Sequence, residues 1–257
     1  MKNFGALAFT FVVAATLGTA QAGQISINES GCQLTAYSAN SVTCATNVAG
    51  TSQATKMSAW SAGSASNFSV ASFGYYPSAG AGIAAQGESL ASPQHAIDNN
   101  GGTDAFLIDF GSLNVALNQL SIGWSGGDAD VSVLRYTGTQ APSLGSFTAA
   151  NLRNAQGWEW VGDYSALTTN PVLNFNTGAN AKTASYWLVS AYNSAYSANP
   201  AGLNLSNGDD YFKLSGFRGD VLAKTAPAND VPEPGTFALF GIALLGIAAV
   251  RRNSKAK

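Results

Sequence analysis

Oxygen-bearing side chains are concentrated in residues 98–104, which run Asp-Asn-Asn-Gly-Gly-Thr-Asp. Asp98, Asn100 and Asp104 offer carboxylate and amide oxygens, and the glycines between them let the backbone turn sharply. Calcium takes about six to eight oxygen ligands, including backbone carbonyls, so this spacing predicts a loop that wraps a Ca²⁺ ion. The loop lacks the spacing and terminal glutamate of an EF-hand. An ordinary turn is the alternative, because Asp, Asn and Gly are typical turn residues.

A further acidic pair follows a Ser-Gly-Gly turn. Asp128 and Asp130 could bind another ion or help to hold the first one. The later run Asn207-Gly208-Asp209-Asp210 is also acidic, and we expect an ordinary hairpin turn there. Ca²⁺ is therefore the one cofactor that the sequence suggests.

Aromatic side chains form the other candidate binding surface. Trp158 and Trp160 are two residues apart, so on a strand they share one face. Together with Tyr192 and Tyr196, which we expect in an exposed loop, they could form a platform on which sugar rings stack. The alternative is that these rings pack in the core of a sandwich, where aromatic side chains dominate.

Residues suited to catalysis are scarce. His95 is the single histidine, so a Ser-His-Asp triad would depend on it, and no Gly-x-Ser-x-Gly turn is present. Glycoside hydrolysis needs two facing carboxylates, and nothing marks any two of Glu29, Glu88 and Glu159 as such a pair. We therefore predict a protein that is not an enzyme, with an extracellular polymer hydrolase as an alternative.

Short strands must position all of these groups. Apolar and aromatic residues alternate with small polar ones in segments such as 68–76, 106–110 and 131–135, with Gly, Asn or Pro turns between them. The alternation breaks near Asn118, which predicts a β-bulge. Parallel sheets need crossover helices, and the pattern contains about ten to twelve strands without a convincing helix. We predict an all-β fold, an antiparallel β-sandwich of jelly-roll type.

The N-terminus has the pattern of an exported protein. Lys2 is followed by an apolar run over residues 4–17 and by Ala20-Gln21-Ala22, which is typical of a signal peptide cut after residue 22. Residues 1–22 would then be removed, and residues 23–230 would form the exported β-sandwich domain.

The C-terminal segment, residues 231–257, has three parts. Pro232, Glu233 and Pro234 form a rigid extended motif, residues 237–250 are apolar and uncharged, and a basic end begins with Arg251 and Arg252. The apolar run is slightly short for a membrane span, which needs about 17–25 residues. The basic end would stay on the cytoplasmic side. A permanent C-terminal anchor and a temporary membrane stop are the two interpretations.

This order of motif, apolar helix and basic end resembles the PEP-CTERM sorting domain of bacterial exported proteins. The resemblance implies that a membrane-embedded exosortase recognises Pro232, Glu233 and Pro234 and processes the tail. It also implies a single transmembrane helix over residues 237–250, inserted transiently, with Arg251 and Arg252 as the basic stop.

The central region resembles exosortase-dependent surface proteins of proteobacteria. The segments that carry this resemblance span most of the predicted domain: Ala96-Ile97-Asp98-Asn99, Leu107-Ile108-Asp109-Phe110-Gly111, Ile122-Gly123-Trp124-Ser125, residues 128–138, Gly157-Trp158 and Tyr186-Trp187-Leu188.

Charge and cysteine content limit the partners of the predicted domain. The chain has 12 Lys and Arg against 14 Asp and Glu, and without the two ends the balance is 7 against 13, a net charge near −6. A domain this acidic has no basic patch for binding nucleic acid through counterion release. Export would place Cys32 and Cys44 in an oxidising compartment, where we expect them to form a disulfide.

We expect an exported, exosortase-sorted protein of the cell surface or extracellular matrix, associated with exopolysaccharide or biofilm and not enzymatic. A calcium-dependent carbohydrate-binding module is the first alternative. The expected partners are the exosortase and, outside the cell, exopolysaccharide or other surface proteins. The expected location is the cell surface, the outer envelope or the secreted matrix.

Overall fold

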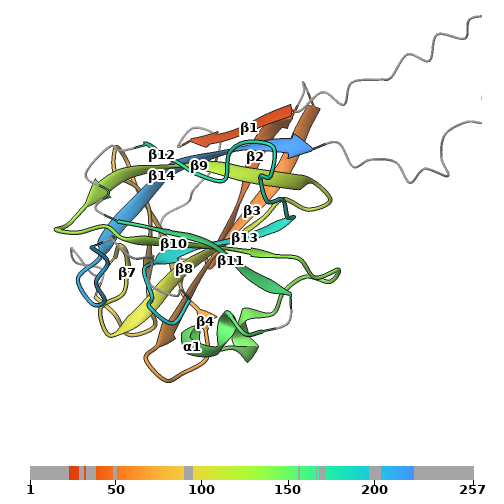
Figure 1. The fold of residues 1–257 in the computed structure, drawn as a ribbon. Helices are drawn as coiled ribbons and strands as arrows, with labels where there is room; N and C mark the ends of the chain where they lie inside the picture. The colour runs from red at the N-terminus through yellow and green to blue at the C-terminus, as the bar shows by residue number, and fades with distance from the viewer. Residues whose placement is uncertain are drawn as a thin grey trace, which may run out of the picture. The chain divides into compact units, whose positions relative to one another are not determined.

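Two antiparallel β-sheets, stacked as a sandwich, make up the fold (Figure 1). The computed structural model describes residues 23–28, 32, 39–48, 51–89, 95–155, 157–165, 167, 172–196 and 204–222. Every strand pair within the two sheets is antiparallel. The predicted all-β antiparallel class is therefore confirmed, while the jelly-roll connectivity stays a prediction.

The first sheet is built around one long strand pair. It has the order β12-β9-β14-β6-β5, and β1 and β7 also pair with β14. The bounds of its strands are β1 Gly23–Asn28, β5 Ser72–Tyr76, β6 Gly80–Ala84, β7 Ile97–Asp98, β9 Asn114–Ser125, β12 Val172–Asn174 and β14 Tyr211–Leu222.

The second sheet has the order β11-β10-β13-β8-β3-β2, and the short β4 pairs with β3. The bounds of its strands are β2 Ser41–Val48, β3 Thr51–Gly63, β4 Ser69–Val70, β8 Gly102–Asp109, β10 Val131–Tyr136, β11 Trp158–Tyr164 and β13 Tyr186–Ala191.

The main core lies between the two sheets. Phe106 of β8 contacts Phe73 of β5 with ring centroids 4.9 Å apart, so the contact joins one sheet to the other. Side chains on a strand alternate between its faces, which places Phe106 and Ile108 in this core and Leu107 on the opposite face of the sheet. The alternation that predicted the strands is thus the pattern that fills the core.

A second apolar cluster covers the outer face of the second sheet. The connection from β10 to β11 crosses this face and carries a 3₁₀ turn, η2 (Leu144–Ser146), and a single helical turn, α1 (Ala149–Leu152). Thr148 and Asn151 cap α1 reciprocally through their side chains and backbone amides. This helical turn, which the sequence did not predict, buries residues on a sheet face that would otherwise meet solvent.

Two local predictions are confirmed. In the β9/β14 pair, Gln119 lies opposite Arg218 and Leu117 opposite Gly219, so Asn118 is the extra residue of a bulge. Its side chain donates to the carboxylate of Asp220 at 2.8 Å.

The predicted disulfide also forms. Cys32 is bonded to Cys44, and the two residues face each other in an isolated antiparallel bridge.

The strand β6 was not predicted, because its residues are mostly glycine and alanine. All five residues of β6 are buried. A Cβ atom on Gly82 would lie 2.0 Å from the backbone oxygen of His95, so only glycine allows the segment before β7 to approach this strand.

Among the described residues, no helix is long and apolar enough to cross a membrane. The predicted signal peptide, the Pro232-Glu233-Pro234 motif, the predicted transmembrane helix and the basic stop at Arg251 and Arg252 lie outside the described residues.

Candidate metal centre

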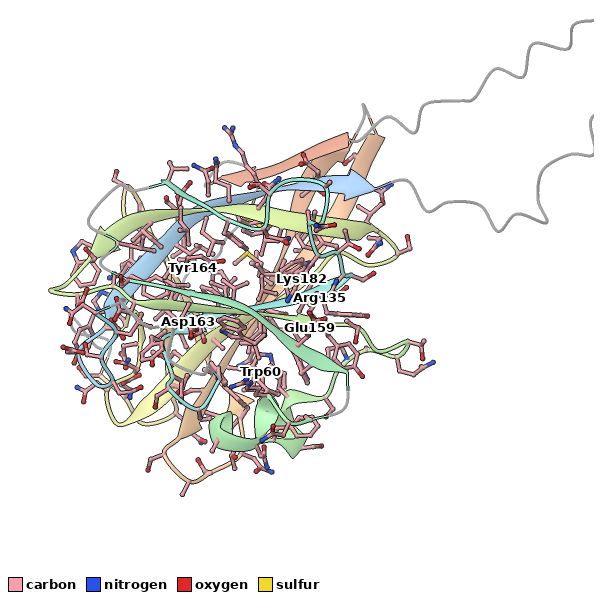
Figure 2. The ribbon with its side chains drawn as sticks, viewed as in Figure 1. Trp60, Arg135, Glu159, Asp163, Tyr164 and Lys182 are labelled. Atoms are coloured by element: carbon pink, nitrogen blue, oxygen red, sulfur yellow. A yellow bond between two sulfur atoms is a disulfide. The ribbon has the colours of Figure 1, made fainter. Side chains whose placement is uncertain are left out.

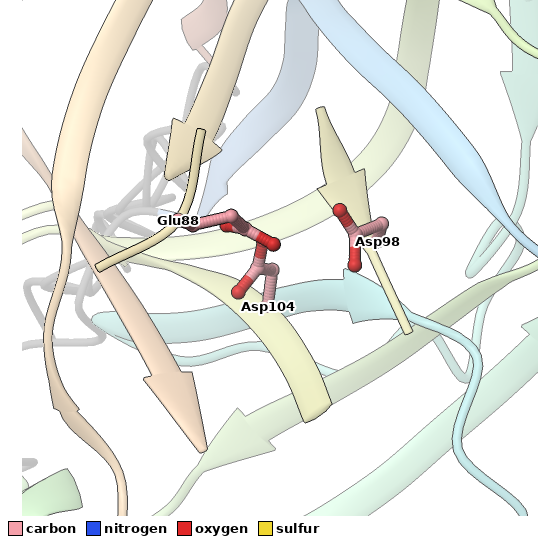
Figure 3. Close-up of side chains that lie close together, drawn as sticks. All are labelled: Glu88, Asp98 and Asp104. Carbon is pink, nitrogen blue, oxygen red and sulfur yellow. The ribbon is translucent and has the colours of Figure 1, made fainter. Parts of the chain in front are cut away.

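Three acidic side chains converge where β7 and β8 approach the end of β3. Asp98 ends β7, Asp104 lies on β8, and Glu88 comes from the connection between β6 and β7 (Figure 3). Each offers a carboxylate oxygen, and these three oxygens all lie within 4.8 Å of one another. The structure therefore brings together the predicted pair Asp98 and Asp104, and it adds Glu88.

The backbone around the cluster explains its geometry. Asp98 accepts a hydrogen bond from the amide of Asn100 at 3.0 Å, which folds the chain back after β7. Gly101 has φ of 77°, a conformation that glycine adopts without strain. Asp104 is two residues from Phe106 and so shares the inward face of β8, at the end of the main core.

Two of the three carboxylates are buried and incompletely bonded. Asp98 and Asp104 are each only 3% exposed. The Oδ2 atom of each is buried and accepts no hydrogen bond from the described residues. Buried polar atoms are normally paired, so two such oxygens in one cluster require an explanation.

The electrostatics of the cluster disfavour three negative charges. Burial raises the pKa of Asp98 to about 7, and the charge of Glu88 adds to the shift. Burial, reinforced by repulsion from Asp98, raises the pKa of Asp104 well above its usual range. Burial also raises the pKa of Glu88. A cation placed among the three oxygens would reverse these shifts.

The basic side chains of the described region lie elsewhere. The ion pairs that the described lysines and arginines form are Arg135–Glu159 at 2.6 Å and Lys182–Glu159 at 2.7 Å (Figure 2). Burial would raise the pKa of Glu159, but hydrogen bonds from Lys182 and Arg135 lower it. The buried Lys213 lies over the ring of Trp124, 3.8 Å from its centroid. The acidic cluster thus has no basic partner among the described ion pairs.

An open pocket of about 450 Å³ adjoins the cluster, and Glu88, Asp98 and Asp104 all line it. The rest of its lining is small or polar, with Ser61, Ser66, Ser69, Gln86, Asn100 and several glycines. Asn100, a predicted metal ligand, instead donates from its side chain to the hydroxyl of Tyr211 at 2.7 Å. It lines the pocket but is not one of the three converging acids.

Asp128 and Asp130 form a separate cluster with Asp210, whose carboxylate oxygens also lie within 4.8 Å of one another. These oxygens are bonded to the backbone: Asp210 accepts from the amide of Asp130 at 2.7 Å, and Asp130 accepts from the amide of Ser206 at 3.0 Å. Burial raises the pKa of Asp210 to about 8, and Asp130 and Asp128 add repulsion. The predicted pair is therefore brought together, but in a hydrogen-bonded junction between loops.

Two residues of these clusters were not predicted as ligands. Glu88 was considered only as a catalytic carboxylate, and Asp210 was assigned to an ordinary hairpin turn. The one available indication for Asp210 was its position directly before a strand that begins with Tyr211 and Phe212, since a buried strand start carries its neighbours inward. Nothing near Glu88 in the sequence indicates that it meets Asp98 and Asp104.

The predicted sugar platform is wrong for three of its four rings. Trp158, Tyr192 and Tyr196 are buried, at 6%, 2% and 0% exposure. Trp158 and Trp160 do share a face, as predicted, but that face packs in the second apolar cluster under the β10–β11 connection. Tyr192 and Tyr196 are therefore not the exposed loop residues that the sequence suggested.

A family model for the PEP-CTERM protein-sorting motif matches residues 230–252. No curated protein and no solved structure matches the chain. The match confirms the sorting segment predicted at the C-terminus and implies processing by an exosortase, export and surface association. The chain therefore carries a PEP-CTERM protein-sorting motif at residues 230–252.

Proposed function

We propose that the chain is a non-enzymatic surface or matrix protein whose β-sandwich binds Ca²⁺ through Glu88, Asp98 and Asp104. The observation that carries this proposal is a pair of buried oxygens, one on Asp98 and one on Asp104, that no described residue bonds. Their cluster has no basic partner among the described ion pairs. A divalent cation would offset the mutual repulsion of the three carboxylates and occupy the unbonded oxygens.

The donor set favours calcium over other metals. All three candidate ligands are carboxylates, and hard oxygen donors suit Ca²⁺, whereas zinc and copper sites use imidazole or thiolate. Calcium also tolerates irregular geometry, which suits ligands drawn from a connection and two strands. Extracellular calcium modules have dissociation constants of about 10⁻⁴–10⁻³ M, so a site of this kind would be filled outside the cell.

The location gives the sandwich its proposed role. The sorting segment implies export to the surface, where exopolysaccharide and biofilm matrix are the abundant neighbours. The near −6 charge of the predicted mature region suits interaction with divalent cations and neutral polymers. We infer that the protein holds matrix polymer at the surface and that calcium organises the end of the sandwich that does so.

Isothermal titration calorimetry on the exported protein, freed of metal with a chelator, tests the calcium site. We expect one exothermic or endothermic binding event with Ca²⁺ near the dissociation constants given above, and much weaker binding of Mg²⁺, which demands a regular octahedron. Glu88→Gln, which removes the half-buried ligand, is expected to weaken Ca²⁺ binding at least about tenfold. Absence of any calcium heat from the folded wild-type protein would refute the site.

Hydrolysis of an extracellular polymer is the second candidate function, and the raised pKa of Asp98 favours it. A carboxyl group with a pKa of about 7 beside other carboxylates has the property of a general acid. Release of reducing ends from matrix polysaccharide, present with wild type and absent with Asp98→Asn in chelator, would support this function. If the wild-type protein releases no reducing ends, the result supports the binding function and not hydrolysis.

A further inference from the structure

The three carboxylates leave the coordination of a bound calcium ion incomplete. Calcium takes about six to eight oxygens, and three carboxylates supply about three to six. Asp98 and Asp104 are buried, whereas Glu88 is half-buried, and all three line the same pocket. The unfilled positions of the ion would therefore open into that pocket.

The rest of the pocket determines which ligand fits those positions. Its lining holds the hydroxyls of Ser61, Ser66 and Ser69 and the amides of Gln86 and Asn100. Serine hydroxyls and side-chain amides both donate and accept hydrogen bonds. Among the described residues of this lining there is no Lys, Arg, His or aromatic residue, so they offer neither a positive charge nor a ring for stacking.

From this arrangement we infer that the pocket binds a glycan through the calcium ion, with two neighbouring hydroxyls of one sugar ring as ligands to the metal. This inference rests on the proposed calcium site. A vicinal diol supplies two neutral oxygens to the incomplete coordination sphere, and the ring's other hydroxyls meet the polar lining. The volume of about 450 Å³ lies within the range of about 300–1,000 Å³ that is typical of small-ligand sites.

The burial of most candidate stacking rings distinguishes this binding mode from one based on aromatic stacking. Three of the four rings that could have stacked on a sugar, Trp158, Tyr192 and Tyr196, are buried, and none of the four lies in the described lining of the pocket. Recognition then depends on the metal and on hydrogen bonds, so removal of calcium abolishes it. A binding protein that relied on aromatic stacking would keep most of its affinity in chelator.

Europium luminescence measures the coordination sphere directly. The exported protein is loaded with Eu³⁺ in place of calcium, and luminescence lifetimes in H₂O and D₂O count the water molecules on the ion. The probes are the methyl glycosides of mannose, galactose and glucose, whose vicinal hydroxyls cover the cis and trans arrangements of hexopyranoses. We expect at least one of them to displace about two waters, and its fully O-methylated derivative to displace none.

A variant with an added side chain in the pocket lining tests glycoside binding independently of metal binding. Gly101 lines the pocket, a Cβ on it would meet nothing within 4 Å, and asparagine tolerates its positive φ. Gly101→Asn therefore adds a side chain to the lining without replacing a calcium ligand. Gly178→Asn is the matched control, because Gly178 also has a positive φ and an unobstructed Cβ but lies outside the pocket lining. We expect Gly101→Asn to weaken glycoside binding at least about tenfold while Eu³⁺ stays bound, and Gly178→Asn to change neither.

The outcomes distinguish this inference from the calcium proposal. If Eu³⁺ and Ca²⁺ bind but none of the three glycosides displaces water at saturating concentration, the glycan inference is wrong and the calcium site stands. Glycoside binding that persists in chelator also overturns it. If neither ion binds the folded protein, both proposals fail.

Discussion

Replacing Asp104 by asparagine removes one carboxylate from the proposed calcium site and keeps the shape of the side chain. Asp104 is 3% exposed, and burial together with Asp98 raises its pKa well above the usual range. Burial and repulsion from Asp98 therefore disfavour the charged form of this carboxyl group in the metal-free protein, and an uncharged amide of the same shape replaces it at little cost. We expect Asp104→Asn to leave the melting temperature in chelator unchanged or slightly raised.

Calcium should stabilise the wild-type protein much more than the Asp104→Asn variant. A ligand that binds only the folded state adds RT ln(1 + [L]/Kd), about 2.7 kcal/mol at about 100 times its dissociation constant. For a domain of roughly 200 residues, 1 kcal/mol shifts the melting temperature by about 2–4 °C. Saturating calcium should therefore raise the wild-type melting temperature by about 5–11 °C, and Asp104→Asn should lose most of that rise.

Differential scanning fluorimetry over a calcium series measures both effects in one experiment. Asp128→Asn is the matched control, because Asp128 belongs to an acidic cluster of the same size whose carboxylates bond to backbone amides. We expect its calcium response to equal that of the wild type. A full calcium shift in Asp104→Asn, or loss of the shift in Asp128→Asn, would show that the ion is assigned to the wrong cluster.

Four further outcomes are expected. In chelator, the free energy of unfolding should fall by up to about 4 kcal/mol as the pH rises from about 4 to 7. Asp98 has a pKa of about 7 in the folded state against 3.8 in the unfolded state, so the folded state holds its proton over this range. Asp98→Asn should reduce this pH dependence in a series of thermal melts. Cys44→Ser, which opens the bond to Cys32, should cost about 2–3 kcal/mol in denaturant titration, and an unchanged midpoint would contradict a structural role. Asn99→Leu should cost about 2–3 kcal/mol, because the buried amide oxygen accepts from the backbone amides of Gly208 and Asp210, and both donors would lose their partner. Mass spectrometry of the mature protein should find the segment after the Pro-Glu-Pro motif missing; an intact tail in cells with a working exosortase would contradict processing.

Local features of the fold were predictable because their causes are local. A strand that buries one face must alternate, so the break at Asn118 could be recognised as a bulge without any knowledge of its partner β14. The sorting segment is a linear pattern of a motif, an apolar run and a basic end, and it needs no tertiary structure to be recognised. The disulfide followed from two cysteines in an exported domain.

The features that the sequence did not reveal depend on what packs against them. β6 pairs with β5 along all five of its residues, and Gly82 lets the chain at His95 approach its backbone; propensity scales contain neither contact. Trp158 and Tyr196 are buried because the β10–β11 connection covers the outer face of the second sheet. Periodicity assigns residues to faces of a strand, but it does not say which face another segment covers.

Two acidic clusters of equal size have different consequences, and composition alone does not separate them. In both, three carboxylates converge within 4.8 Å and burial raises pKa values. The difference lies in the bonding: the oxygens around Asp210 are bonded to backbone amides, whereas Asp98 and Asp104 each keep a buried oxygen that no described residue bonds. Carboxylate oxygens that accept backbone hydrogen bonds hold loops in place, whereas oxygens that accept none are available to bind a cation.

The chain places these two roles on consecutive residues. Asp98 contributes to the proposed calcium site, while the next residue, Asn99, bonds the side chain of Asp210 and the backbone amides of Gly208 and Asp210. Side chains of consecutive residues in extended backbone project to opposite sides, so a single short segment serves the acidic cluster on one side and the loop junction on the other. The junction thereby anchors the backbone that presents Asp98, which keeps repelling carboxylates together before a cation arrives. Preorganisation of this kind explains why a cluster that is unfavourable in the metal-free protein persists in its fold.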